Sequence, residues 1–194
     1  MAVLRENLAK YVDMYNESSA AANQLADVLL FDYMLQHLAR VSRILAKPAG
    51  NGLLIGLGGN GRKTVAKLAT YINECTEQHI EFTKDYGEAQ WRDDLRNLYK
   101  TIGVENKKTV FNLADRDIID ELFIEDINNI LNVGELTSLF TAADYEDIEF
   151  DLEKQLVAAK VKDRSRENKM TIFQKRCQRN LHLLLYFSPA GNQL

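Results

Sequence analysis

The sequence of 194 residues has little cysteine, no long apolar run and no large excess of one charge. Its two cysteines, Cys75 and Cys177, are too few for a disulfide framework and lack the spacing of metal ligands. No apolar run approaches the roughly 18 residues of a membrane-spanning helix, and no apolar segment follows a basic stretch at the N-terminus. These absences predict a protein of a reducing, intracellular compartment without a membrane span.

The near balance of acidic and basic residues argues against two classes of partner. The chain has 24 basic and 28 acidic residues, which gives a formal net charge of −4. Such a balance provides no long-range attraction to nucleic acid or to an anionic membrane, so neither is expected as a partner. With 46% hydrophobic residues, the chain can bury a core as one domain, or as one domain with an appendage.

The most informative segment is a glycine-rich turn between an apolar strand and a helix. Residues 53–64 read LLIGLGGNGRKT. Glycines permit positive φ and let the backbone approach an anion closely, while the N-terminus of the next helix presents unpaired N–H groups. The segment therefore predicts a phosphate-binding loop, with a merely structural turn as the alternative. The candidate ligands are Gly56, Gly58, Gly59, Asn60, Gly61, Arg62, Lys63 and Thr64.

The loop departs from the phosphate-loop pattern G-x-x-x-x-G-K-[ST] in its last positions. Gly56 and Gly61 match the outer glycines, but Arg62 stands where lysine belongs and Lys63 where the hydroxyl belongs. Thr64 follows one place late. Arg62 keeps the positive charge, although its planar guanidinium does not replace a lysine ammonium atom for atom. Lys63 points about 100° further round the helix, which favours an exposed position.

Hydrophobic periodicity predicts helices that alternate with strands, and a breaker cluster at 48–52 precedes the phosphate loop. This alternation is typical of the α/β class, with a parallel sheet covered on both faces. The continuous apolar runs at 53–55 and 183–187 indicate strands buried on both faces. The expected helices cover about 2–17, 28–45, 63–72, 89–101, 123–131 and a long charged helical region at 144–179; the expected strands cover 53–55, 79–82, 109–113 and 181–188.

Ligands of open α/β sheets bind beyond the carboxyl ends of the strands. This rule gathers the loop at 56–61, Asp115 and Ser188 around one crevice. Asp115 closes an apolar strand and is a candidate to hold Mg²⁺ through water, with a strand-end turn as the alternative. Thr64 is the candidate hydroxyl for Mg²⁺ or phosphate, or else an ordinary residue of the helix surface.

Two residues near this crevice are unusual. A glutamate should follow the metal-holding acid if water is to be activated, yet the residue is Arg116, which argues against hydrolysis. Asn112 lies inside an apolar strand. A buried amide needs hydrogen-bond partners, so we expect Asn112 at a strand edge or facing solvent.

Other titratable residues favour structural roles. The three histidines are scattered over a helix and two strands without ligand spacing. Four acidic residues follow the strand that contains Asn112. We interpret them as a solvated helix face rather than as a metal site. The histidines are His37, His79 and His182, and the acids are Glu121, Glu125, Asp126 and Glu135.

Several segments together resemble the fourth AAA+ module of a dynein heavy chain. The similarity covers nearly the whole chain, and the run FIEDINN at 123–129 is its most specific element, because no general P-loop protein requires it. Arg62 in place of lysine resembles axonemal dyneins in particular. The matching segments are 28–31, 38–45, 52–62, 91–95, 123–135 and 180–189.

The resemblance implies a P-loop AAA+ large subdomain with a helical insertion before the last strand. An N-terminal helical segment, 1–47, would pack on a core at 48–194. Carried over by position, the phosphate loop is 56–64, the Walker B acid is Asp115, and Ser188 is the sensor at the end of the fourth strand. The segment near 25–31 would border the adenine. The implied cofactors are ATP or ADP, with Mg²⁺.

The resemblance also implies a setting. Dynein modules form a ring of six, in which the first module carries the main ATP hydrolysis and later ones bind nucleotide for regulation or structure. The implied partners are the neighbouring modules, with microtubules contacted only indirectly. The implied location is cytoplasmic, on the cytoskeleton of a cilium or axoneme.

The chain departs from the family pattern in two ways. Members commonly have serine at 60, glutamine at 63, serine at 64 and an apolar residue at 112, and threonine and glutamine where this chain has Arg116 and Asp117. A fifth strand and a helical lid are also expected, but neither is recognised before Leu194. These absences predict a fragment, a truncated product or a chain that needs a partner, with the strand at 53–56 as a bare edge. Without stalk and linker segments, no motor activity is expected of the chain alone.

Three functions fit the sequence. The leading interpretation is a regulatory module that holds adenine nucleotide and hydrolyses it slowly or not at all. The second is a structural module whose loop holds at most an adventitious anion. The third, an independent P-loop kinase or NTPase, needs a lid and a catalytic acid that the sequence does not reveal.

Overall fold

The computed structural model describes residues 2–19, 24–25, 28–80, 82–134, 136 and 138–189. At least one helix separates each strand from the next along the chain, as the periodicity predicts. They are α1 (Ala2–Ser18), α2 (Asp32–Leu45), β1 (Gly52–Ile55), α3 (Arg62–Ile72), β2 (Thr76–Gln78), α4 (Glu88–Gly103), β3 (Thr109–Ala114), the 3₁₀ turn η2 (Asp115–Asp117), α5 (Glu121–Asn132), α6 (Ala142–Ala158), α7 (Arg166–Asn180) and β4 (Leu181–Phe187).

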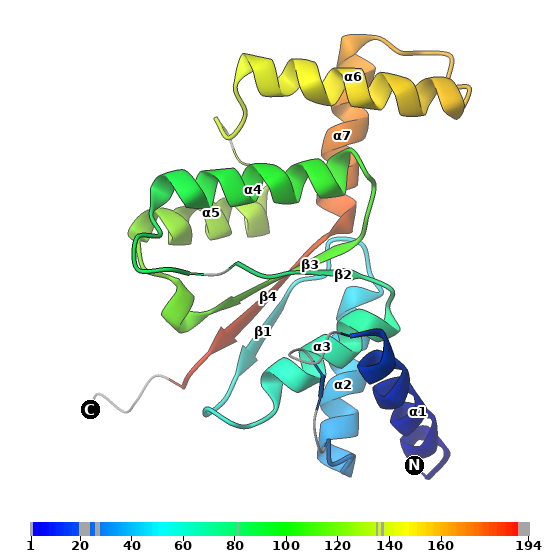
Figure 1. The fold of residues 1–194 in the computed structure, drawn as a ribbon, viewed down its shortest axis with the longest axis vertical. Coiled ribbons are helices and arrows are strands. Elements are labelled where there is room, and N and C mark those ends of the chain that lie inside the picture. Colours follow the sequence, from blue (N-terminus) through cyan, green and yellow to red (C-terminus); the bar gives the residue numbers. More distant parts are fainter. Residues whose placement is uncertain are drawn as a thin grey trace.

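The four strands form one parallel sheet in the order β1-β4-β3-β2, so the α/β prediction is confirmed. The central strands β3 and β4 are buried along almost their whole length. Their side chains alternate between two hydrophobic cores, one on each face of the sheet. Helices α1, α2 and α3 supply one core, while α4 and α5, with parts of α6 and α7, supply the other (Figure 1).

Helices α6 and α7 form the insertion expected before the last strand. Figure 1 shows α6 lying across α7 at the end of the molecule away from β1, with α7 leading directly into β4. The single charged helical region expected at 144–179 is two helices, because the chain turns at Lys160 (φ 55°) and Ser165 then caps α7. Among the described residues, no helix is long and apolar enough to cross a membrane.

Strand β1 lies at an edge of the described sheet, and this position corrects one expectation. A strand buried on both faces was predicted at 53–55, but Leu53 and Ile55 are 54% and 62% exposed. Leu54 packs on the core with α2 and α3, while its two neighbours face the uncovered side. The apolar run therefore forms a strand, as predicted, but helices cover only one face of it.

Two further boundaries differ from the periodicity. The strand expected at 79–82 lies earlier, at Thr76–Gln78. These three residues pair in parallel with Thr109, Val110 and Phe111 of β3. Ile80 is buried beyond the strand end, whereas Glu81 lies outside the described residues. Helix α2 begins at Asp32 rather than near Val28, since Phe31 is extended (φ −107°, ψ 159°) and forms its N-cap.

Candidate functional site

The glycine-rich loop joins β1 to α3 at the carboxyl end of the sheet, as predicted. Gly59 and Gly61 have positive φ, 82° and 73°, a conformation that favours glycine. Gly61 is the N-cap of α3. A Cβ atom added at Gly58, Gly59 or Gly61 would meet no atom within 4 Å. The loop therefore leaves open space at a helix N-terminus, which is suited to an anion.

Arg62 is turned toward the strand ends beneath this loop. Its Nη1 donates to the carbonyl oxygens of Phe187 (2.5 Å) and Leu54 (3.5 Å), and its Nη2 to that of Leu57 (3.5 Å). The guanidinium thus joins the carboxyl ends of β1 and β4 to the loop. The cation expected at the phosphates is engaged by backbone carbonyls instead.

The structure brings Asp115 and Ser188 together. The backbone N–H of Ser188 donates to Oδ2 of Asp115 (2.8 Å), and that of Arg116 donates to Oδ1 (2.9 Å). The hydrogen bonds from Ser188 hold the pKa of Asp115 below its usual value, and the positive charge of Arg62 lowers this pKa further. Asp115 is therefore an ionised carboxylate beside the glycine-rich loop, at the ends of two adjacent strands.

A polar hollow of about 390 Å³ extends from α3 toward β2. Lys63 is exposed, as expected, and lines this hollow together with Lys67 one helical turn later. Thr64 is half-buried in the first turn of α3. The hollow is lined by Lys63, Lys67, Glu77, His79, Asn112, Ala114, Asp117 and Tyr186.

Asn112 forms the floor of this hollow, and the prediction that it faces solvent or a strand edge is wrong. It is 7% exposed in a central strand. The hydroxyl of Tyr186 donates to its Oδ1 (2.6 Å), and its Nδ2 donates to Glu77 (2.9 Å). Burial, followed by the charge of Glu77, raises the pKa of Tyr186 and keeps the phenol a donor. Sequence reasoning missed Lys67, Glu77 and Tyr186, because α3, β2 and β4 bring them together only in the folded protein.

The predicted cluster of four acids does not form one solvated helix face. Glu121 and Glu125 are exposed, as expected, but Asp126 is 4% exposed and accepts a hydrogen bond from Trp91 Nε1 (2.8 Å). Arg92 lies 3.5 Å from its other oxygen. Asp126 therefore anchors α5 to α4, and Glu135 lies outside the described residues.

The histidines occupy unrelated places. His37 lies against Tyr33 on α2, and His79 is exposed at the hollow. His182 is 1% exposed, with Nδ1 2.9 Å from the carbonyl oxygen of Gly50. Because a carbonyl only accepts, Nδ1 of His182 carries the proton and donates it. His182 thus ties β4 to the turn that precedes β1.

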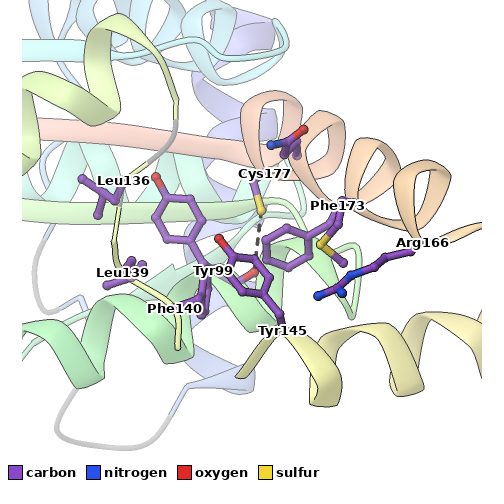
Figure 2. Close-up of a pocket in the computed structure, with 10 residues that line it drawn as sticks. Tyr99, Leu136, Leu139, Phe140, Tyr145, Arg166, Phe173 and Cys177 are labelled. Carbon is purple, nitrogen blue, oxygen red and sulfur yellow. Dashed lines mark hydrogen bonds between the residues drawn. The ribbon is translucent and has the colours of Figure 1, made fainter. Parts of the chain in front are cut away.

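A second cavity, of about 300 Å³, lies beneath the helical insertion. Figure 2 shows the rings of Tyr99, Tyr145 and Phe173 around it. Cys177 on its wall lies 3.8 Å from the carbonyl oxygen of Tyr99, and Arg166 at one side pairs with Glu149 (2.6 Å). This mainly apolar lining fits a packing gap rather than a nucleotide site.

The segment expected to border the adenine is only partly described. Leu25, Val28 and Leu30 pack against the core on the α2–α3 side, whereas Ala26 and Asp27 lie outside the described residues. The described crevice therefore joins the loop at 56–61, Arg62, Asp115 and Ser188.

Comparison with known proteins gives one consistent family. Residues 26–194 match the model of the P-loop containing dynein motor region D4. The chain is 36% identical over 192 residues to dynein axonemal heavy chain 2 of Homo sapiens, covering 99% of the chain. It is 36% identical over 191 residues to the dynein-1-beta heavy chain of the flagellar inner arm I1 complex of Chlamydomonas reinhardtii, covering 98%. It is 34% identical over 191 residues to dynein axonemal heavy chain 5 of Rattus norvegicus, also covering 98%. The chain spans only 4 to 5% of the length of these relatives.

Proposed function

Because this chain belongs to the family of the P-loop containing dynein motor region D4, we propose that it binds ATP or ADP as a regulatory AAA+ module. The observation that carries the proposal is the open loop at the N-terminus of α3, with the ionised Asp115 and Ser188 beside it. A loop of N–H donors at a helix N-terminus binds phosphate, and an adjacent carboxylate suits a metal counter-ion. The family is one in which nucleotide binding is expected.

The phosphates would lie on the loop and the first turn of α3. Here the backbone N–H groups and the positive end of the helix dipole favour an anion. Ser188 would sense the terminal phosphate from the end of β4, where its N–H already holds Asp115. The proposed phosphate-site residues are Gly56, Gly58, Gly59, Asn60, Gly61, Arg62, Lys63, Thr64 and Ser188.

The proposed metal ligands, Thr64 and Asp115, fit Mg²⁺ in their chemistry. Each oxygen of Asp115 accepts one backbone N–H, which leaves lone pairs for a metal or its water. Mg²⁺ is commonly held by one or two protein oxygens, together with phosphate oxygens and water. Bound there, the ion would neutralise phosphate charge.

We propose slow hydrolysis or none. Arg116 occupies the position after Asp115, and its side chain is 74% exposed beside Asp117. Asp117 is committed to the backbone N–H of Ala114 (2.9 Å). Without a free carboxylate at position 116, no group at this position activates water. Phosphate release from ATP should therefore stay close to the uncatalysed background.

Within a dynein heavy chain, the module would contact neighbouring AAA+ modules of the ring and influence microtubule-based ciliary movement through them. Its place would be the cytoskeleton of a cilium or axoneme, and microtubules would be contacted only indirectly. The division into an N-terminal segment at 1–47 and a core at 48–194 belongs to this proposal. It is supported by the packing of α1 and α2 on α3.

One observation favours the second function, a structural module that binds no nucleotide. Arg62 donates to three backbone carbonyls, so its charge already has partners. Nucleotide binding must then succeed without the cation that phosphate loops normally provide. The two functions differ in a measurable property, the affinity for nucleotide.

Equilibrium binding of fluorescent ATP by the full chain, with and without Mg²⁺, tests the proposal. Wild-type protein should bind more tightly with Mg²⁺, and Asp115→Asn should remove this difference by deleting the charge on the proposed ligand. Asp151→Asn, at an exposed aspartate of α6, is the matched control and should behave as wild type. An unchanged magnesium dependence in Asp115→Asn would refute the metal assignment, and no binding by folded wild-type protein would favour the structural module.

A further inference from the structure

Two lysines of α3 face the polar hollow beside the phosphate loop. Lys63 and Lys67 are four residues apart, so they lie on one side of the helix. Both line the hollow of about 390 Å³, and neither has an ion pair with any described residue. Two ammonium groups without a carboxylate partner are free to meet an anion, although Glu77 and Asp117 line the same hollow.

The hollow adjoins the phosphate site. Lys63 is the second residue of α3, immediately after the loop that would hold the phosphates. The opposite wall includes Ala114 and Asp117, which flank Asp115 on either side. A phosphate chain longer than the loop can hold would therefore extend between α3 and the end of β3, past the two lysines.

The acids of the hollow are already engaged. Glu77 accepts from Asn112, and Asp117 accepts from the backbone N–H of Ala114. These hydrogen bonds hold both carboxylates on the β2–β3 side of the hollow, so neither forms an ion pair with Lys63 or Lys67. An incoming anion is repelled by these carboxylates and attracted by the lysines, whose flexible stems can approach it while both carboxylates keep their hydrogen bonds.

The guanidinium of Arg62, in contrast to the two lysines, already has partners. It is held by the carbonyl oxygens of Phe187, Leu54 and Leu57, at the ends of β1 and β4. A lysine ammonium is compact and carries three donors on a flexible stem, which suits a phosphate that arrives from solvent. The positive charges beside the loop that have no ion-pair partner among the described residues are thus those of Lys63 and Lys67.

We propose that Lys63 and Lys67, rather than Arg62, bind the terminal phosphate of a nucleoside triphosphate and give the site a preference for ATP over ADP. This inference rests on the proposed nucleotide binding and adds a specificity to it. A diphosphate ends within the loop and does not reach the two ammonium groups.

Calorimetric titration of the full chain with ATP and with ADP tests the inference. Lys63→Gln and Lys67→Gln should each weaken ATP binding about tenfold, the usual effect of losing a hydrogen bond to a charged group. ADP binding should be unchanged, and Lys63→Arg should retain the preference. Lys175→Gln, at an exposed lysine of α7, removes the same charge elsewhere and should match wild type.

Other results of these titrations would overturn the lysine assignment, the proposed function or both. Equal losses for ATP and ADP, or none for either, would overturn the assignment of the lysines. Wild-type protein that binds both nucleotides equally would uphold the proposed function and overturn this inference. A folded wild-type chain that binds neither would overturn both, and far-ultraviolet circular dichroism of every variant checks the fold.

Discussion

Arg62 shows how one substitution changes the duty of a residue. The phosphate-loop pattern predicts a cation for phosphate, and the structure gives a cation that ties two strand ends to a loop. The difference follows from shape, since the planar guanidinium carries five donors in a fixed fork and reaches several carbonyls at once. Arg62 is thus a structural residue of the crevice even without a ligand.

Replacing Arg62 should therefore lower stability in the absence of nucleotide. Arg62→Gln removes donors from the carbonyls of Phe187 and Leu57, and we expect a loss of about 1–2 kcal/mol in the free energy of unfolding. Urea denaturation measures it. Lys63→Gln, at the exposed neighbour, is the control and should change little. Equal stability of Arg62→Gln and wild type would show that the carbonyls find water at no cost.

His182 should make stability depend on pH. Burial lowers the pKa of His182, and the bond to Gly50 only partly opposes this. As pH falls through about 6.5, the unfolded chain takes up a proton that the folded chain refuses. Stability is therefore complete above about pH 6.5 and declines below it, by at most about 1.4 kcal/mol per pH unit.

The test is urea denaturation between pH 7.5 and 5.5, roughly the range in which histidine titrates. His182→Gln keeps a donor for Gly50 and should flatten the profile, whereas His79→Gln, at an exposed histidine, should keep the wild-type slope. Asp144 has its pKa lowered to about 2 by the backbone hydrogen bond from Thr141 and by Lys100, so its contribution is lost only at more acidic pH. A steep profile in His182→Gln would assign the effect to another group.

At the level of single residues, sequence placed the glycines, Asp115 and Ser188 at one end of the sheet, because a local pattern or a strand end marks them. It did not find the partners of Asn112 or Asp126. Asn112 bonds to Glu77, and Asp126 to Trp91, each 35 positions away along the chain. Such pairs exist only once the sheet and its helices are assembled, so no local spacing predicts them.

At the level of elements, the contact between α4 and α7 is tight at Gly103. A Cβ atom there would meet the Phe173 ring at 2.3 Å and Cys177 Sγ at 2.9 Å. Gly103→Ala should therefore destabilise the fold by about 1–3 kcal/mol despite the better helix propensity of alanine. Thermal unfolding measures this loss.

Gly87→Ala provides the matched control for that change. Gly87 precedes α4, and an added Cβ would meet only Gln90 Oε1, at 3.8 Å. This variant should unfold at the wild-type temperature. A wild-type melting temperature for Gly103→Ala would instead mean that α7 moves freely relative to α4.

Helices and strands differ in how well the sequence defines them. Helices α1, α3, α4 and α5 lie within one or two residues of their expected ranges because the apolar positions recur over several turns. Strand β2 has three residues, too few for alternation to fix its position. The break between α6 and α7 carries neither proline nor glycine, so the charged sequence reads as continuous.

At the level of the whole molecule, the open edge of β1 is the most exposed apolar feature of the described sheet. Leu53 and Ile55 are more than half exposed beside unpaired backbone groups. Edges of this kind template pairing between chains. We expect Ile55→Lys to reduce self-association at high protein concentration, measured by sedimentation velocity, with an unchanged circular dichroism spectrum.

Phe150→Lys is the control for this prediction. Phe150 is 65% exposed on α6. Figure 1 shows α6 at the end of the molecule away from β1. If both variants reduce self-association equally, general surface hydrophobicity is responsible rather than the edge of β1. If neither does, this edge is not a site of association.

The whole crevice takes part in the proposed binding of a nucleotide at the loop between β1 and α3. Amide hydrogen exchange of the full chain, with and without saturating ATP or ADP and Mg²⁺, tests it most directly. Bound nucleotide should slow exchange at residues 57–64 and at Ser188 and leave α6 unchanged, because phosphate engages the loop N–H groups. Unchanged exchange in the loop of a folded chain, or protection confined to another region, would contradict it.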